Sequence, residues 1–289
     1  MWIANDWQDF EVIDCGDGEK LERWGEIILR RPDPQAIWPK SNTALWETAD
    51  GVYHRSNQGG GQWTFARRLP EHWNIRYQKY MFVVHPTNFK HTGLFPEQAA
   101  NWTWMAQTIQ SAHRPVQVLN LFAYTGGATI ACAGAGASVC HVDAAKGMIS
   151  WAKENATASN LQNRSIRYII DDCLKFVQRE IRRGKQYDAI IMDPPSYGRG
   201  PGGEVWALED KLFELVHECT KVLCEKPLFF LINSYTTGLQ SSVLSNLLHT
   251  TVVNRFGGTV DAQEVGLPVT YGVPVLPCGC SARWVGTHA

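Results

Sequence analysis

Acidic side chains recur directly after predicted strands in the middle of this chain. Asp143 follows the strand-like segment 138–142, Asp172 follows 167–170, and Asp193 follows the apolar run 187–192. Helical segments separate these strands, so the strands should lie parallel in one sheet with their carboxyl ends at a common edge. Carboxylates at that edge accept hydrogen bonds from hydroxyl and amine groups, which predicts a site for a polar ligand there.

The first two of these positions suit the polar parts of an adenosine. The Asp143 carboxylate can accept hydrogen bonds from both ribose hydroxyls. The Asp172 carboxylate can receive the exocyclic amine of adenine, while the backbone N–H of Cys173 can donate to a ring nitrogen. Asp171 can replace Asp172 in this role, because strand ends are predicted only to within a residue or two. Capping of the following helices is the alternative role for these acids.

Asp193 opens a segment that suits a flat substrate carrying N–H groups. In Asp193-Pro194-Pro195-Ser196-Tyr197, two prolines hold the backbone extended and remove two N–H donors. The carboxylate and the nearby carbonyl groups then face the site as acceptors. Tyr197 can stack on the substrate or serve in packing, and Asn233, just after the next predicted strand, can add a hydrogen bond. The predicted catalytic residues are therefore Asp193, Pro194, Pro195, Tyr197 and Asn233.

A glycine-containing turn follows the first predicted strand of this region, Val116 to Phe122. The turn reads Asn120-Leu121-Phe122-Ala123-Tyr124-Thr125-Gly126-Gly127, and its glycines come only where the next helix begins. They allow a ligand to approach backbone N–H groups at the helix N-terminus, but their spacing is not the G-x-G-x-x-G of dinucleotide sites. This turn disfavours a nicotinamide oxidoreductase.

The elements that position these residues alternate between strands and helices from residue 89 onward. This order predicts an α/β fold, in which a mostly parallel sheet carries helices on both faces. Residues 1–88 instead contain short alternating segments between Gly- and Pro-rich turns, which indicates a small β-rich domain. We therefore expect a domain boundary near residue 88, with the ligand site in residues 89–289.

Composition limits the class of protein further. The 289 residues include 27 Lys and Arg against 28 Asp and Glu, so a nucleic-acid partner would have to be held by a local basic patch. The sequence contains no run of 18 apolar residues, so we predict no membrane-spanning helix. The eight scattered cysteines are typical of reduced cytoplasmic thiols, and Cys278-Gly-Cys280 lacks the spacing of a metal or redox pair. We expect a cytoplasmic protein without a metal site, and the sequence indicates no particular oligomeric state.

Taken in order, five segments resemble a known family. They are Asn120 to Ala128, Val142-Asp143, Trp151 to Asn155, Asp172-Cys173-Leu174 and Asp193-Pro194-Pro195. In order and spacing they are similar to class I S-adenosylmethionine-dependent methyltransferases of the bacterial large-subunit ribosomal-RNA group, which includes enzymes for cytosine C5 and guanine N7. Upstream, Lys90 to Gln98 resembles the segment that opens the group's catalytic domain and lines its cofactor pocket. The resemblance covers roughly residues 80–285.

The resemblance implies a Rossmann-like sheet of seven strands whose last strand is antiparallel, with Ser281 to Val285 as the candidate. It implies S-adenosylmethionine as cofactor and methyl transfer at Asp193. Together with the residues considered above, it gives the predicted cofactor set Phe95, Asn120, Phe122, Ala123, Tyr124, Thr125, Gly126, Asp143, Ala144, Asp172, Cys173 and Asp193.

Two departures from the group's pattern narrow the expected chemistry. Cytosine C5 members carry a cysteine nucleophile just after strand five, because C5 reacts only after a thiolate has added to C6. This chain has Asn233-Ser234-Tyr235 there, which favours a nitrogen acceptor. In addition, no N-terminal RNA-binding domain of the kind found in some members is apparent, so residues 1–88 are expected to form the substrate-side wall.

We therefore predict an S-adenosylmethionine-dependent enzyme that methylates a base in ribosomal RNA. A methyltransferase for a small molecule or a protein is the first alternative, because the near-neutral charge permits it. A noncatalytic RNA-binding module on the same fold is the alternative from another class, against which the presence of both Asp143 and Asp193 argues.

Overall fold

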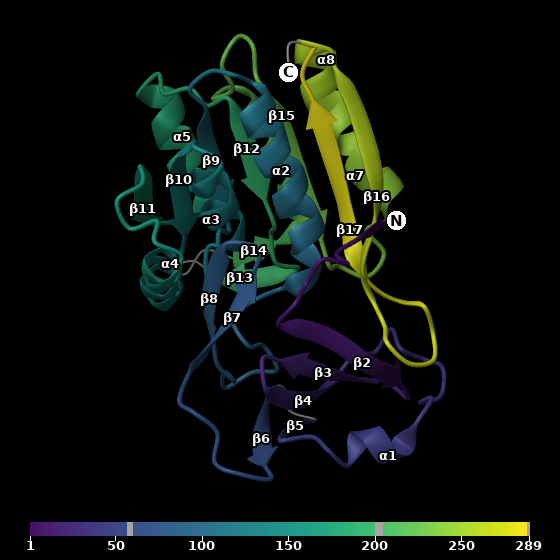
Figure 1. The fold of residues 1–289 in the computed structure, drawn as a ribbon. Coiled ribbons are helices and arrows are strands. Elements are labelled where there is room, and N and C mark those ends of the chain that lie inside the picture. Colours follow the sequence, from purple (N-terminus) through teal and green to yellow (C-terminus); the bar gives the residue numbers. More distant parts are fainter. Residues whose placement is uncertain (57–59, 200–204, 288–289) are drawn as a thin grey trace. The chain divides into compact units, whose positions relative to one another are not determined.

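The computed structural model describes residues 1–56, 60–199 and 205–287, and the chain divides into two compact units (Figure 1). The first unit comprises Met1–Ala100 and Val265–Cys278, and the second comprises Asn101–Glu264 and Gly279–Ala289. The domain boundary near residue 88 stays a prediction. The compact units divide the chain differently, because residues 265–278, distant in sequence, pack with the first unit.

The first unit is built mainly from strands. Its five-stranded sheet has the order β2-β3-β4-β5-β6, from β2 (Phe10–Gly16), β3 (Glu19–Trp24), β4 (Ile27–Pro32), β5 (Gly51–Arg55) and β6 (Gly61–Phe65). Only β4 and β5 pair in parallel. A separate hairpin contains β7 (Trp73–Tyr77) and β8 (Tyr80–Val84), and β1 (Trp2–Ile3) pairs with residues 265–266. Two short helices, α1 (Thr43–Trp46) and η1 (Pro96–Gln98), complete it.

Burial alternates along β4, as expected for a strand with one face on a core. Ile27, Leu29 and Arg31 are buried on that face. The Arg31 guanidinium is accommodated there because its Nε and Nη2 donate to the two carboxylate oxygens of the fully buried Glu22, at 2.6 and 2.8 Å. Removal of either partner would leave a buried charge without this pairing.

The second unit carries most of an eight-stranded, mostly parallel sheet in the order β1-β16-β17-β15-β12-β9-β10-β11, where the resemblance implied seven strands; β1, the end of β16 and the start of β17 belong to the first unit. Its strands are β9 (Gln117–Leu121), β10 (Ser138–Asp143), β11 (Ile166–Ile170), β12 (Ala189–Met192), β15 (Phe229–Ser234), β16 (Thr259–Pro268) and β17 (Val275–Val285). Its helices are α2 (Ala99–Ser111), α3 (Gly127–Gly134), α4 (Lys146–Ala158), α5 (Cys173–Arg182), α6 (Leu208–Thr220), α7 (Ser241–Leu248), η2 (His249–Val253) and α8 (Asn254–Phe256). A short antiparallel pair, β13 (Tyr197–Arg199) and β14 (Val205–Ala207), follows β12.

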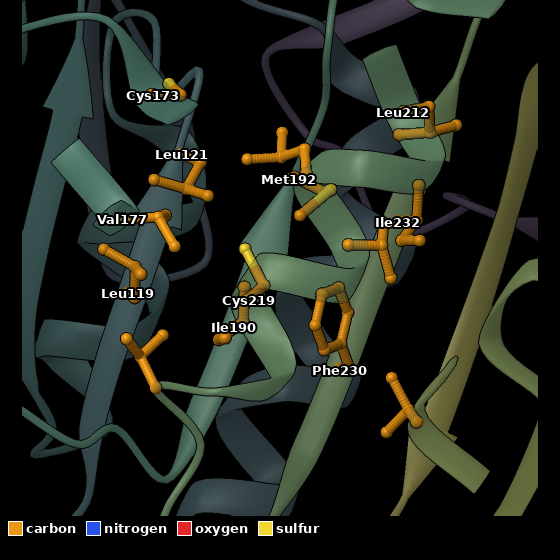
Figure 2. Packing of buried hydrophobic residues seen from close by; sticks show 14 of the residues in the cluster. Leu119, Leu121, Cys173, Val177, Ile190, Met192, Leu212, Cys219, Phe230 and Ile232 are labelled. Atoms are coloured by element: carbon orange, nitrogen blue, oxygen red, sulfur yellow. The ribbon is translucent and has the colours of Figure 1, made fainter. Parts of the chain in front are cut away.

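The central strands are buried on both faces, which explains their nearly continuous apolar sequences. On one face, Leu119, Leu121, Ile190 and Met192 pack with residues of α5, α6 and α7 in a single core cluster (Figure 2). The alternate residues of the same strands point to the other face, where α3 and α4 contact β9, β10 and β11. Helices on both faces of the sheet confirm the predicted Rossmann-like fold.

The last strand also runs as predicted, because β17 pairs antiparallel with β15. This pairing changes one detail of the prediction. Asn233 and Ser234 lie within β15 rather than after it, since both pair with residues of β17, Ser281 and Cys280. A strand end fixed by a partner 48 residues away leaves no local signal in the sequence. In the described part of the chain, no helix is long and apolar enough to cross a membrane.

Candidate functional site

The sheet of the second unit reverses its strand order between β9 and β12. From β9 the chain continues outward through β10 and β11, whereas β12 and β15 lie on the opposite side of β9. All of these neighbours are parallel, so their carboxyl ends share one edge. Ligands of open α/β sheets bind outside that edge at the reversal point. The predicted site residues other than Phe95 lie at this edge or in the strands that lead to it.

The turn between β9 and α3 has an unusual backbone. Phe122, Tyr124 and Gly126 all have positive φ angles, of 53°, 51° and 89°. The Ala123 N–H donates to the Val142 carbonyl at 3.0 Å, and the Asn155 side chain donates to the Thr125 carbonyl at 2.8 Å. The strained turn is therefore held in place by hydrogen bonds to β10 and α4.

Gly126 is the N-cap residue of α3, and no side chain caps this helix. The N–H groups of the first turn of a helix have no intrahelical acceptors, so they remain available to an acceptor on a ligand. A side chain at Gly126 would be strained by the positive φ, and its Cβ would lie 3.1 Å from the Cβ of Ala152. Glycine thus keeps this helix end open.

Asp143, the last residue of β10, is the polar centre of the turn. Its Oδ2 accepts from the Tyr124 N–H at 2.9 Å, and its Oδ1 accepts from the Ala145 N–H at 2.8 Å. Burial raises the pKa of this carboxyl group, although the two backbone N–H groups act in the opposite direction. Each carboxylate oxygen has a further lone pair for a hydroxyl group. Ala144, the next residue, is half-buried.

Asp172 and Cys173 start α5 at the same edge. Asp172 caps the helix through a 2.9 Å hydrogen bond from the Lys175 N–H, so the capping role is present in the structure. Asp171, the alternative, is engaged by Arg179. The buried Cys173 Sγ accepts from the Phe122 N–H at 3.4 Å, which links α5 to the β9 turn. The adenine contacts predicted for Asp172 and Cys173 stay predictions.

Asn120 takes part in a buried hydrogen-bond group beneath the turn. Its side-chain amide donates to the Thr129 hydroxyl at 2.9 Å, and that hydroxyl lies 2.9 Å from Nδ1 of His141. Burial lowers the pKa of the His141 ring to about 3, so the ring is neutral near pH 7. This geometry gives Asn120 a role in supporting the turn, and its predicted contact with the cofactor is untested.

At the end of β12, the Asp193 carboxylate accepts a 2.9 Å hydrogen bond from the Asn233 side chain. Two residues predicted from separate segments are thus brought together. Pro194 is buried, whereas Pro195 and Tyr197 are exposed, and 59% of Tyr197 is accessible to solvent. An exposed tyrosine beside this edge is available for stacking, as the sequence prediction requires.

Trp206 was not anticipated from the sequence. Its indole N–H donates to the Pro195 carbonyl at 2.6 Å, and its ring lies 5.0 Å from that of Phe122. It therefore joins the segment after β12 to the turn after β9. One of the carbonyl groups expected to face the substrate is occupied by this bond. An isolated tryptophan in a Gly-rich segment carries no sequence pattern that indicates such a role.

Phe95 belongs to the first compact unit, at the N-cap of η1, where its ring lies 5.4 Å from that of His91. Its place at the cofactor therefore remains a prediction from the resemblance alone.

An open helix end and carboxylates at the switch point of an α/β sheet suit a cofactor that carries an adenosine. The chain belongs to the S-adenosylmethionine-dependent methyltransferase family, whose family model matches residues 46–216. The fold, the enzyme class and the use of S-adenosylmethionine predicted above are thereby confirmed.

Solved structures extend the similarity over almost the whole chain. A crystal structure of an S-adenosylmethionine-dependent methyltransferase from Agrobacterium tumefaciens is 38% identical in sequence, with a TM-score of 0.92 over 96% of this chain and 91% of that one. Another crystal structure, a complex with S-adenosylhomocysteine, is 18% identical with a TM-score of 0.73, over 97% of this chain and 76% of that one. Because its sequence identity is low, the second of these similarities shows only a common fold.

Curated relatives match a shorter region. A ribosomal RNA large subunit methyltransferase K/L from Syntrophotalea carbinolica is 31% identical over 144 residues, which is 50% of this chain and 19% of that protein. The protein of the same name from Shewanella oneidensis is 34% identical over 117 residues, or 40% of this chain and 16% of that protein. This chain therefore spans less than a fifth of the length of these relatives.

The residues at the edge fit the cofactor. The uncapped N-terminus of α3 offers N–H donors, and the spare lone pairs of Asp143 offer acceptors for two hydroxyl groups. The half-buried setting of Asp143 excludes part of the solvent that would otherwise compete for these bonds. We expect Asp143 and the turn from Phe122 to Gly126 to hold the cofactor.

Proposed function

We propose that this protein methylates a nitrogen atom of a base in ribosomal RNA. The names of the curated relatives support the RNA substrate. The cofactor supplies an activated methyl group, and an uncharged base nitrogen accepts it without a covalent intermediate on the protein. The protein's own residues must then orient the base and exclude water.

The observation that carries the choice of a nitrogen acceptor is the state of the cysteines. Methylation at cytosine C5 requires a thiolate at the site. All eight cysteine thiols have raised pKa values, and burial is the first cause in each case. Protonated thiols are poor nucleophiles, and six of these eight are also buried, so these side chains do not suit C5 chemistry.

Cys280 is the cysteine whose position most affects this conclusion. It pairs with Ser234 at the end of β15, so it lies nearer to the site edge than its place in the sequence indicated. Its thiol is buried and donates to the Leu239 carbonyl at 3.1 Å, and burial raises its pKa to about 11. These contacts support a structural role.

Asp193 and Asn233 supply the polar groups that a base would meet. The Asn233 amide donates to the Asp193 carboxylate, and a carboxylate has several lone pairs with which it can also accept from an N–H group on the base. Tyr197, exposed just downstream, can cover the face of a base that has left its stack. In this proposal Pro194 and Pro195 keep the segment extended.

The first unit carries features that suit the predicted substrate-side wall. Residues 52–92 contain Arg55, Arg67, Arg68, Arg76, Lys79 and Lys90 but only one acidic residue, Glu71. On β6, the rings of Trp63 and Phe65 stack at 5.9 Å with an interplanar angle of 6°, and 47% of Phe65 is exposed. Arg55, which is exposed, lies on the same face of the hairpin by strand alternation. An exposed ring stacked on a half-buried one, on the same face as a cation, suits the binding of single-stranded RNA.

The proposed function is tested with a tritiated methyl donor and ribosomal RNA from cells that lack the gene, beside protein and metabolite fractions. We expect label in RNA alone, and in an N-methylated base when the nucleosides are separated. Label only in protein or in small molecules would contradict the proposal. An Asp193→Ala enzyme should lose transfer by at least about 100-fold, whereas Glu154→Gln, an exposed change on α4, should not.

The role of the first unit is tested separately by RNA binding. Phe65→Ala should weaken binding to single-stranded ribosomal RNA fragments by about tenfold, because a base stacked on an aromatic ring contributes about 1–3 kcal/mol. Ile37→Ala, which removes another exposed apolar side chain of this unit, is the matched control. Equal affinity of the two variants would refute the stacking role while leaving the methyltransferase assignment intact.

A further inference from the structure

A buried chain of hydrogen bonds leads from Arg283 to the carboxylate of Asp193. The Arg283 guanidinium donates to the Asn101 side-chain oxygen through Nε at 2.9 Å and Nη2 at 2.8 Å. Asn101 Nδ2 donates to the Ser281 hydroxyl at 2.9 Å, and that hydroxyl donates to Oδ1 of Asn233 at 2.7 Å. Asn233 Nδ2 then donates to Asp193 at 2.9 Å. All five residues belong to the second unit.

Every link of this chain donates in the same direction, and the chemistry of its ends requires that direction. A guanidinium group has only donors, so the Asn101 amide must turn its oxygen toward Arg283 and its NH₂ group toward Ser281. A carboxylate has only acceptors, so the Asn233 amide must turn its NH₂ group toward Asp193. The Ser281 hydroxyl accepts from one amide and donates to the other, so it joins the two orientations that the end groups require.

The chain is shielded from water. Asn101, Asn233 and Ser281 are fully buried, and Arg283 is 8% exposed, with its guanidinium 5.0 Å from the ring centre of Trp104. Burial lowers the pKa of Arg283 to about 10, so it remains a cation near pH 7. In a low-dielectric interior, a cation at one end polarises successive hydrogen bonds toward the anion at the other.

The elements joined by the chain are far apart in sequence. Asn101 lies on α2, Ser281 and Arg283 on β17, Asn233 on β15, and Asp193 follows β12. Packing of side chains does not by itself hold the NH₂ end of the Asn233 amide toward the carboxylate. The hydrogen bonds of this chain do hold it there, and they end at Asp193, the residue that the proposed function places beside the methyl acceptor.

We propose that Asn101, Ser281 and Arg283 are positioning residues, which fix the Asn233 amide and through it aim the Asp193 carboxylate at the group that accepts the methyl. None of the three contacts the substrate in this scheme. The inference rests on the proposed function, because it assumes that Asp193 orients the acceptor.

Ser281→Ala is the most direct test, because it removes little more than the hydroxyl that joins the two amides. We expect kcat for methyl transfer to RNA to fall by about tenfold or more, since a small misplacement of an orienting group has a large effect on rate. The Kd for S-adenosylhomocysteine, measured by calorimetry, should stay within twofold of the wild-type value. Ser281→Thr retains the hydroxyl in a strand that accepts β-branched residues, and it should restore most of kcat.

Thr251→Val is the matched control for the loss of a buried hydroxyl. The Thr251 hydroxyl is in the same unit and donates to the Leu247 carbonyl at 2.7 Å, away from this chain of hydrogen bonds. Its loss should reduce thermal stability without reducing kcat. If Ser281→Ala lowers stability as Thr251→Val does and leaves kcat unchanged, the chain is only structural and the inference is wrong.

A second measurement does not depend on turnover. The side-chain NH₂ resonances of Asn233, assigned by their loss in Asn233→Asp, should shift in Ser281→Ala and return in Ser281→Thr. Unchanged resonances in Ser281→Ala would overturn the inference even if activity fell. Absence of RNA methylation by the wild-type protein would instead refute the proposed function, so the two failures are distinguishable.

Discussion

Replacement of Asp143 by alanine gives the sharpest test of the cofactor site. The carboxylate holds two backbone N–H groups, and only one of them, that of the part-buried Tyr124, would lose a partner in a place that water reaches poorly. The N–H of the exposed Ala145 can bind water instead. The structural cost of Asp143→Ala should therefore be about 1–2 kcal/mol, that of one unsatisfied donor.

The loss of cofactor affinity should be larger than this structural cost. A hydrogen bond to a charged acceptor contributes about 1.5–3 kcal/mol, and two ribose hydroxyls are expected on Asp143. At the lower limit the two bonds sum to about 3 kcal/mol, which corresponds to a Kd roughly 100-fold higher. Calorimetric titration with S-adenosylhomocysteine measures this Kd without turnover, and a thermal melt measures the stability separately.

Glu154→Gln is the control for the loss of a negative charge, because this exposed residue lies on α4, the helix that follows Asp143. It should bind the product with wild-type affinity. If Asp143→Ala also binds within twofold of wild type while its melting temperature falls, then Asp143 only supports the turn. The assignment of the ribose to this carboxylate would be refuted by that result.

Three further predictions follow from the same edge of the sheet. Burial raises the pKa of Asp143, so folding favours the neutral carboxyl group, and this contribution to stability is present below the ordinary aspartate pKa near 4 and is lost as pH rises through the raised value. Binding of the ribose hydroxyls uses the charged carboxylate, so the affinity for S-adenosylhomocysteine should fall when acidification protonates Asp143, at a pH above that ordinary value. Asp143→Asn should abolish this pH dependence. Gly126→Ala should destabilise the protein by about 1–2 kcal/mol through its positive φ, as a denaturant titration would reveal, whereas Gly147→Ala on α4 meets no atoms and should be neutral or stabilising. Cys280→Ala should methylate RNA within twofold of wild type, and a 100-fold loss would show that a thiolate takes part after all.

Local sequence predicted the parts of the site that depend on one strand and the turn after it. The β-branched run before Asp193 and the two prolines after it place that carboxylate at the end of β12, where the structure has it. The glycines after β9 likewise identify the start of α3. Strand propensity and proline stereochemistry act within a few residues, so they can be read without a fold.

Features that depend on distant partners could not be predicted in this way. Pairing with β17 draws Asn233 into β15, and Ser281 is separated from Asn101 by 180 positions. The capping bond of Asp172 shows a different limit, because a helix cap and an adenine acceptor use the same residue at the same strand end. No sequence pattern separates those two roles, and only a bound ligand does.

The buried hydrogen bonds from Arg283 to Asp193 have a further consequence, because the polypeptide is synthesised from its N-terminus. The turn after β9, Asp143 and Asp193 emerge early, while β17 follows them by about 80 residues or more. The nascent protein can thus form the wall for the cofactor before Ser281 and Arg283 exist, and domains fold in part during synthesis. Until β17 inserts between β15 and β16, the Asn233 amide lacks the Ser281 hydroxyl that holds its oxygen. Insertion of this one strand would therefore act as the final assembly step, after which a cofactor-binding fold becomes competent for methyl transfer.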